Sequence, residues 1–202
     1  LVSEYEYLHT GCSVEQICSI TLREGIRSLQ HTLNLLSPEA VEKAVDTILA
    51  ARRIRLFGVG NSAVVALDMH NKLQRIGLDS HFSLDTHCQL TAAATLTQED
   101  CAVIFSYDGT TKDMVDATRY ALDSGAVVIT ITRYSNNPIC EKGDIALYVA
   151  ANESLVRSAA MSSRLAMLSM VDMIFSCVAS RCHDDILGLL KRTAHIIREI
   201  KK

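Results

Sequence analysis

The chain has 202 residues, of which 49% are hydrophobic and 21% charged, and its formal net charge at pH 7 is −3. This length suits one α/β domain with a sizeable core, the composition excludes a disordered chain, and the charge does not favour nucleic-acid binding by this segment itself. Seven cysteines without a CxxC pair, no signal peptide and no apolar run long enough to span a membrane together predict a reduced, cytoplasmic protein with no membrane contact.

The N-terminal part of the chain carries helical periodicity before any strand pattern. Residues 1–13 are expected to form a loose lead-in, and the first residue, Leu1, suggests a chain cut from a longer protein. Large apolar residues then recur at spacings of four, three, four and three. This heptad seam consists of Leu22, Ile26, Leu29, Leu33 and Leu36. Two heptads leave two alternatives open: a coiled coil with another helix, or a helix lying on its own domain. Ser37-Pro38-Glu39 ends this helix and begins the next.

Apolar strand patterns and helical patterns alternate from residue 54 onward. The expected strands are 54–60, 80–83, 101–105, 126–132 and 145–149. Helices are expected between them, among them 63–76 and 87–94, and two more after residue 154, the last one carrying apolar residues from 186 to 200. This alternation predicts an α/β fold with a parallel sheet covered on both faces. We expect a three-layer sandwich with the flavodoxin-like strand order 2-1-3-4-5.

A polar turn follows the third expected strand. The apolar run ending at Phe105 changes abruptly to Ser106, and Gly109, Thr110 and Thr111 precede a helical pattern. Free backbone N–H groups and the positive end of the helix dipole would then point at this turn, where hydroxyl groups add further donors. The sequence therefore predicts an anion site, although the same residues would also serve merely to cap a helix.

A second turn, Gly60-Asn61-Ser62, follows the first expected strand. It satisfies the dinucleotide fingerprint G-x-G-x-x-G/A only weakly, because Asp79 begins the next strand instead of ending it. In the expected strand order, the first and third strands are neighbours at the point where the order reverses, so both turns would face one crevice. Two hydroxyl-bearing turns around a crevice suit a phosphate joined to a polyhydroxylated body. Two ordinary strand-to-helix turns remain the plainer alternative.

These residues carry a resemblance to a known family. Phe57-Gly-Val-Gly-Asn-Ser62 and Ser106-Tyr-Asp-Gly-Thr-Thr111 resemble the two phosphate-binding turns of sugar isomerase (SIS) domains, the second being similar to S-x-S-G-x-T. The segments 51–60, 157–164 and 172–175 resemble specifically the RpiR family of bacterial transcriptional regulators. The resemblance implies a helix-turn-helix domain upstream, absent from this chain. Residues 1–36 would then be lead-in and connector helix, and residues 37–202 the phosphosugar-binding domain.

The resemblance also implies the ligand set. The family's phosphate ligands fall on Ser62, Ser106 and Thr111, while its second serine is replaced by Asp108. This carboxylate would weaken phosphate binding unless it turns away or pairs with Lys112, and the plainer alternative is that it only caps the next helix. Glu153 is expected to bind sugar hydroxyls. The complete expected ligand-binding set is Gly60, Asn61, Ser62, Ser106, Asp108, Gly109, Thr110, Thr111 and Glu153.

The expected function is that of an effector domain. It would bind a sugar phosphate or amino-sugar phosphate as a homodimer or tetramer and control DNA binding by the missing domain, with no cofactor, metal or catalytic residue. The alternative is an aldose–ketose isomerase, which needs a positioned base. Glu153 would then be that base, and a histidine such as His70, His81 or His87 would assist ring opening.

Overall fold

The computed structural model describes residues 11–151, 160–182, 188–189, 191–193 and 195. These residues form a five-stranded parallel sheet with the order β2-β1-β3-β4-β5, which confirms the predicted topology. The strands are β1 Arg53–Phe57, β2 Ser80–Phe82, β3 Asp100–Phe105, β4 Val127–Arg133 and β5 Ile145–Val149. The helices are α1 Val14–Leu35, α2 Pro38–Ala50, α3 Asn61–Arg75, α4 Thr86–Ala94, α5 Lys112–Asp123 and α6 Met161–Arg181.

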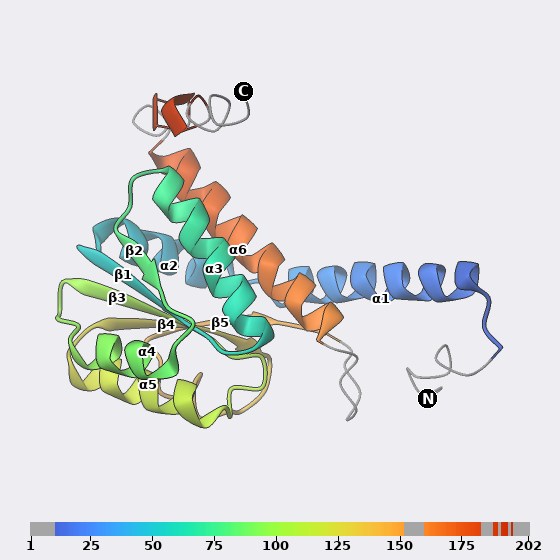
Figure 1. Cartoon of the computed structure of the whole chain (residues 1–202), viewed down its shortest axis with the longest axis horizontal. Helices are drawn as coiled ribbons and strands as arrows, with labels where there is room; N and C mark the ends of the chain where they lie inside the picture. Colours follow the sequence, from blue (N-terminus) through green and yellow to red (C-terminus); the bar gives the residue numbers. More distant parts are fainter. Residues whose placement is uncertain (1–10, 152–159, 183–187, 190, 194, 196–202) are drawn as a thin grey trace.

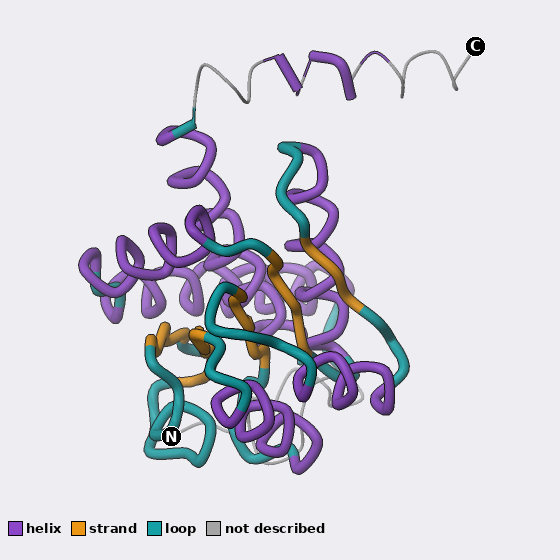
Figure 2. The backbone as a smooth tube through the Cα atoms, turned by 90° about the vertical axis from the view of Figure 1, so that its left-hand side faces the viewer, coloured by secondary structure: helices purple, strands orange, loops and turns teal. Residues whose placement is uncertain are grey.

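Helices cover both faces of the sheet, so the three-layer prediction is also confirmed. α2, α3 and α6 lie on one face, and α4 and α5 lie on the other (Figures 1 and 2). The central strand β3 is buried along its whole length and alternates between two cores. Val103 and Phe105 belong to the core under α2, α3 and α6, whereas Ala102 and Ile104 belong to the core under α4 and α5. A strand buried on both faces has to be apolar throughout, which explains the sequence of β3.

The helix α1 lies on its own domain, but mainly through residues outside the heptad seam, of which Leu36 packs partly buried against the core. Its buried residues are Gly25, Ser28 and Thr32, and it packs against α6 and β5. A Cβ added at Gly25 would lie 3.0 Å from a methyl carbon of Leu165, so glycine permits a close approach between the two helices. Three residues of the seam, Leu22, Ile26 and Leu33, remain 68%, 62% and 59% exposed. Figure 1 shows α1 extending away from the body of the domain.

Two predictions need correction, one on the start of a helix and one on apolar length. The third helix was expected from residue 63, but α3 begins at Asn61, directly after the N-cap residue Gly60, so Asn61 and Ser62 belong to its first turn. No apolar run long enough to span a membrane was expected, yet α6 is long and apolar enough by length and composition. It packs against α1, α2 and α3, which accounts for its apolar residues as a core helix. The expected last helix lies largely outside the described residues.

Candidate functional site

The turn after β1 depends on two glycines and one buried amide. A Cβ at Gly58 would lie 2.8 Å from the carbonyl oxygen of Ser62, so only glycine lets β1 run directly into α3. Gly60 has φ +58° and ψ −128°, a conformation that residues with a side chain avoid. Gln89 of α4 is 2% exposed. Its side chain accepts a hydrogen bond from Gly58 N at 3.0 Å and donates one to Gly58 O at 3.0 Å, which fixes the turn.

The turn after β3 brings two hydroxyl groups to the N-terminus of α5. Ser106 is 3% exposed, and its Oγ lies 3.5 Å from Oγ1 of Thr111. Thr111 is the N-cap residue of α5, and its side chain makes no capping hydrogen bond. The N-terminal amides of α5 and these hydroxyls therefore form one donor-rich surface, as an oxyanion requires.

Gly109, in this turn, packs closely against the loop that follows β4. It has φ +66°, and its N–H donates to Ser106 O at 3.1 Å. A Cβ at this position would overlap the side chain of Asn137. Asn137 is 3% exposed and donates to Oγ1 of Thr132 at 3.2 Å, while its side-chain oxygen accepts from Cys140 N at 3.0 Å. The loop after β4 thus supports the turn, a relationship that no local sequence signal revealed.

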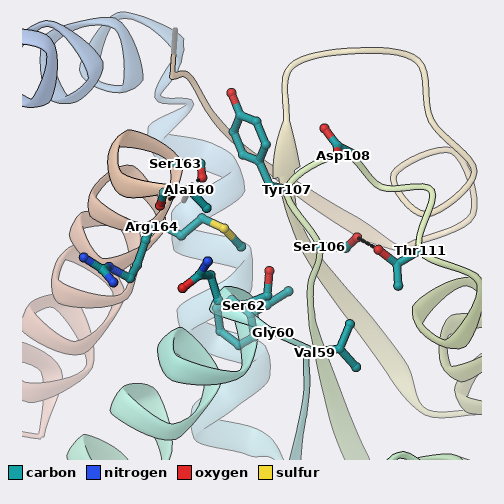
Figure 3. A pocket seen from close by; sticks show the side chains of 13 residues that line it. Val59, Gly60, Ser62, Ser106, Tyr107, Asp108, Thr111, Ala160, Ser163 and Arg164 are labelled. Atoms are coloured by element: carbon teal, nitrogen blue, oxygen red, sulfur yellow. Dashed lines mark hydrogen bonds between the residues drawn. The ribbon is translucent and has the colours of Figure 1, made fainter. Parts of the chain in front are cut away.

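The two turns and the first turn of α6 enclose a pocket of about 330 Å³ (Figure 3). Six of the nine predicted residues line it: Gly60, Asn61, Ser62, Ser106, Asp108 and Thr111. Gly109 is buried behind the turn and Thr110 is exposed, and neither lines the pocket. Glu153 lies outside the described residues. The structure therefore brings both predicted turns to one crevice, as the strand order required.

The pocket also has a wall that sequence reasoning did not assign to the site. Tyr107 follows Ser106, and α6 contributes Ser163, Arg164 and Met167. Arg164 makes no ion pair with any described residue, and it is the cationic side chain among the described residues that line the pocket. Only the resemblance of segment 157–164 to the RpiR family had pointed to this part of the chain.

Asp108 is turned toward a cation and away from the hydroxyl pair. Its Oδ1 lies 3.8 Å from Nε of Arg133 at the end of β4. Figure 3 shows its carboxylate directed away from the hydroxyls of Ser106 and Thr111. The plainer reading of Asp108 as a helix N-cap is wrong, since Thr111 holds that position. The negative charge is therefore partly offset and lies apart from the donor surface.

The histidines considered for ring opening lie elsewhere. His70 is in α3, His81 in β2 and His87 in α4, and none of them is among the described residues lining the pocket. Nδ1 of His70 lies 3.0 Å from Oγ of Ser80, and burial, followed by the neighbouring His81, lowers the pKa of His70. Within the described residues, no group of three or more His, Cys, Asp or Glu side chains is placed to hold a metal ion.

Comparisons with known proteins agree with this geometry. Residues 47–177 match the family profile of the SIS domain. The chain is 35% identical over 171 residues to an uncharacterized HTH-type transcriptional regulator of Caldanaerobacter subterraneus, an alignment that covers 85% of this chain and 61% of that protein. The chain therefore spans less than two thirds of the length of this relative.

Two solved structures have the same fold. The Vibrio vulnificus NanR protein complexed with ManNAc-6P superposes with a TM-score of 0.87 and 24% identity, covering 93% of this chain and 70% of that one. The sugar isomerase domain of an RpiR transcription factor from Sphaerobacter thermophilus gives a TM-score of 0.81 and 24% identity, covering 89% of this chain and 99% of that one. At this level of identity, the likeness shows the fold alone.

Proposed function

Since the chain belongs to the SIS domain family, we propose that it is the effector-binding domain of a phosphosugar-responsive transcriptional regulator. It binds a sugar phosphate or amino-sugar phosphate, and the bound ligand alters DNA binding by a helix-turn-helix domain in a part of the protein that this chain does not include. The whole regulator is cytoplasmic. The residues before position 37 form its lead-in and connector, and the residues from 37 onward form the ligand-binding domain.

The observation that carries this proposal is the donor surface at the end of β3. Ser106 and Thr111 place hydroxyl groups 3.5 Å apart at the N-terminus of α5, and Ser62 faces them from the first turn of α3. Helix N-termini attract anions through their free N–H groups and the helix dipole. The phosphate binds here, and the sugar extends toward the wall formed by α6, where Arg164 is available to an acceptor group.

The relative from Caldanaerobacter subterraneus, which is named as an HTH-type transcriptional regulator, supports a sensor role for this chain. Its alignment with this chain covers 61% of its length, which leaves room for a DNA-binding domain outside the matched region. The solved NanR structure, whose description includes ManNAc-6P, supports a phosphorylated amino sugar as one ligand to test. An effector that binds the two states of a regulator unequally shifts its affinity for DNA by that difference.

Self-association through α1 belongs to the same proposal. Leu22, Ile26 and Leu33 are 68%, 62% and 59% exposed on one side of a helix. Exposed apolar side chains at heptad spacing become buried when a second helix packs against them. We infer a homodimer, or a tetramer built from such dimers, in which the symmetry of the protein matches paired half-sites on DNA.

Ligand binding tests the proposal directly. The chain is titrated by calorimetry with N-acetylmannosamine 6-phosphate, glucosamine 6-phosphate and arabinose 5-phosphate, and with each corresponding unphosphorylated sugar. Binding is expected only for phosphorylated compounds. Ser106→Ala and Thr111→Val each remove a hydrogen bond to a charged group, worth about 1.5–3 kcal/mol, so affinity falls by about tenfold or more. Ser169→Ala is the matched control, because its hydroxyl bonds within α6 to Ala166 O.

Two outcomes would overturn the proposal. Equal affinity for phosphorylated and unphosphorylated sugars would show that the two turns are not a phosphate site. Conversion of a phosphosugar to its isomer, measured by chromatography, would show an isomerase instead of a sensor if Glu153→Gln abolished it.

A further inference from the structure

Ala150, the first residue after β5, is held by the connector helix α1. Oγ of Ser28 donates to Ala150 O at 2.6 Å, and Oγ1 of Thr32 donates to the same oxygen at 3.2 Å. Ala150 N donates in return to Oγ1 of Thr32 at 3.1 Å. Ser28 and Thr32 are 2% and 1% exposed. The contact between α1 and Ala150 is thus made by buried polar groups, while Leu22, Ile26 and Leu33 of the apolar seam are exposed.

The same segment is held from its other side by the pocket. The hydroxyl of Tyr107 donates to Ala151 O at 2.8 Å and accepts from Ala151 N at 3.2 Å. Tyr107 is 8% exposed, lines the pocket and stands between Ser106 and Asp108 in the turn. One side chain therefore joins the anion-binding turn to the chain segment that α1 grips.

We propose that Tyr107 couples occupancy of the phosphate pocket to the position of α1 through Ala151 and Ala150. This inference rests on the proposed function and names the route by which that site would regulate DNA binding. Ala150 O, which accepts from Ser28 and Thr32, and Ala151 N, which donates to the hydroxyl of Tyr107, belong to one and the same peptide group. A ligand that draws the Ser106–Thr111 turn inward displaces Tyr107, and Ala151, Ala150 and α1 have to follow or lose their hydrogen bonds.

Hydrogen bonds suit this role better than apolar packing. They weaken steeply with distance and angle, and a buried donor or acceptor left without a partner carries the full cost of its desolvation. Apolar contacts can slide without such a penalty. The hydrogen bonds that link Tyr107, Ala150 and Thr32 therefore tolerate little displacement, and a small shift of the turn also shifts α1.

Amide hydrogen exchange without ligand is the first test. Tyr107→Phe removes one hydroxyl and keeps the ring, and Tyr134→Phe is the control because Tyr134 is 68% exposed. Exchange of Ala150 N–H and of the α1 amides around Ser28 and Thr32 is expected to quicken by about fivefold or more in Tyr107→Phe only. Faster exchange confined to Ala151, with exchange in α1 unchanged, would show that Tyr107 stabilises only its immediate neighbour and would overturn the coupling.

The second test repeats the hydrogen-exchange measurement in the presence of inorganic phosphate at millimolar concentration. Phosphate is expected to slow exchange in the Ser106–Thr111 turn of every protein, but to slow exchange in α1 only where Tyr107 is intact. Equal slowing of α1 in Tyr107→Phe would overturn the inference. If the turn of the unaltered protein gains no protection from phosphate, the proposed phosphate site fails, and the experiment without ligand still decides the coupling.

Thr32→Val tests the same route from the other end. Linkage is reciprocal, so a change in α1 that alters the route must alter phosphate affinity although Thr32 does not line the pocket. A change of at least about threefold in the dissociation constant is expected. Thr47→Val is the matched control, since that hydroxyl bonds within α2 to Lys43 O. Identical affinities for Thr32→Val and the control would contradict the inference.

Discussion

Nε of Arg133 lies 3.8 Å from Oδ1 of Asp108, so the acidic side chain at the pocket rim faces a cation supplied by the end of β4. By the sequence resemblance, Asp108 is expected to stand where the motif S-x-S-G-x-T has its second serine. Its charge alone would repel a phosphate about 5 Å away by roughly 3 kcal/mol at an effective dielectric near 20. With Arg133 beside it and the carboxylate turned away from Ser106, this penalty is smaller than the sequence suggested.

The first prediction is that Arg133 masks Asp108. Arg133→Met is expected to weaken phosphosugar binding by about two- to fivefold, the range of a half-exposed ion pair. Asp108→Ser then strengthens binding by a larger factor in the Arg133→Met background than in the unaltered protein, where the gain stays below about tenfold. Calorimetry on the four proteins of this cycle measures both effects. Arg119→Met, a change in an exposed cation of α5, is the control. Equal gains in both backgrounds would show that the two side chains act independently.

The second prediction concerns the support of the β3 turn. Gly109→Ala is expected to destabilise the protein by well over 1 kcal/mol, because φ +66° and the overlap with Asn137 both oppose a side chain. In an Asn137→Gly background the overlap disappears and only the backbone cost remains, so the additional loss caused by Gly109→Ala becomes smaller. Urea unfolding of the four proteins gives the coupling free energy. A cost of Gly109→Ala that is the same in both backgrounds would show that the backbone conformation alone requires glycine.

The third prediction is that the α1 seam holds two copies together. Leu22→Glu combined with Ile26→Glu is expected to convert the dimer to a monomer at tens of micromolar, since the two charges would be buried between facing helices. Leu84→Glu is the control, because Leu84 is 77% exposed and lies outside the seam. Sedimentation measures the masses. A sedimentation profile of the double variant that matches the unaltered protein would place the interface elsewhere.

The fourth prediction is an acid-sensitive contribution from Asp100. Its side chain is fully buried at the start of β3, where Arg53 donates from Nε at 3.0 Å and Thr97 N donates at 2.8 Å. The hydrogen bond from Arg53, supported by Thr97, lowers the pKa of Asp100 far below its usual value. The folded state therefore holds the proton less tightly than the unfolded chain. This stabilisation is complete above about pH 4, the unfolded pKa, and is lost as the pH falls below it.

Asp100→Asn isolates this contribution. The substitution is expected to lower the free energy of unfolding at pH 7 by about 3 kcal/mol, because Arg53 loses a buried partner. It should also flatten the decline in stability as the pH falls from about 4 toward 2, which urea unfolding at several pH values would measure. The exposed Asp123, whose side chain is 68% accessible, provides the control Asp123→Asn. A decline as steep as that of the unaltered protein would assign the acid sensitivity to other carboxyl groups.

Local sequence patterns were sufficient to predict the sheet and the two turns of the pocket. Apolar runs such as Cys101–Phe105 and the helical periodicities between them are short-range signals, because each follows from how one segment buries its own side chains. Strand alternation then fixed the order, and the order placed Ser62 opposite Ser106. Local chemistry therefore sufficed to predict six of the residues that line the pocket, among them Thr111 at the start of α5.

Only the tertiary structure decided how these parts are held and connected. α1 shows a heptad seam in sequence, yet it rests on the domain through Ser28 and Thr32, because their hydroxyls meet a peptide group 118 or more residues away. Asn137 behind Gly109 and Arg133 beside Asp108 likewise join segments from different strands. Such pairings depend on the relative placement of distant backbones, which no periodicity or turn motif within one segment encodes.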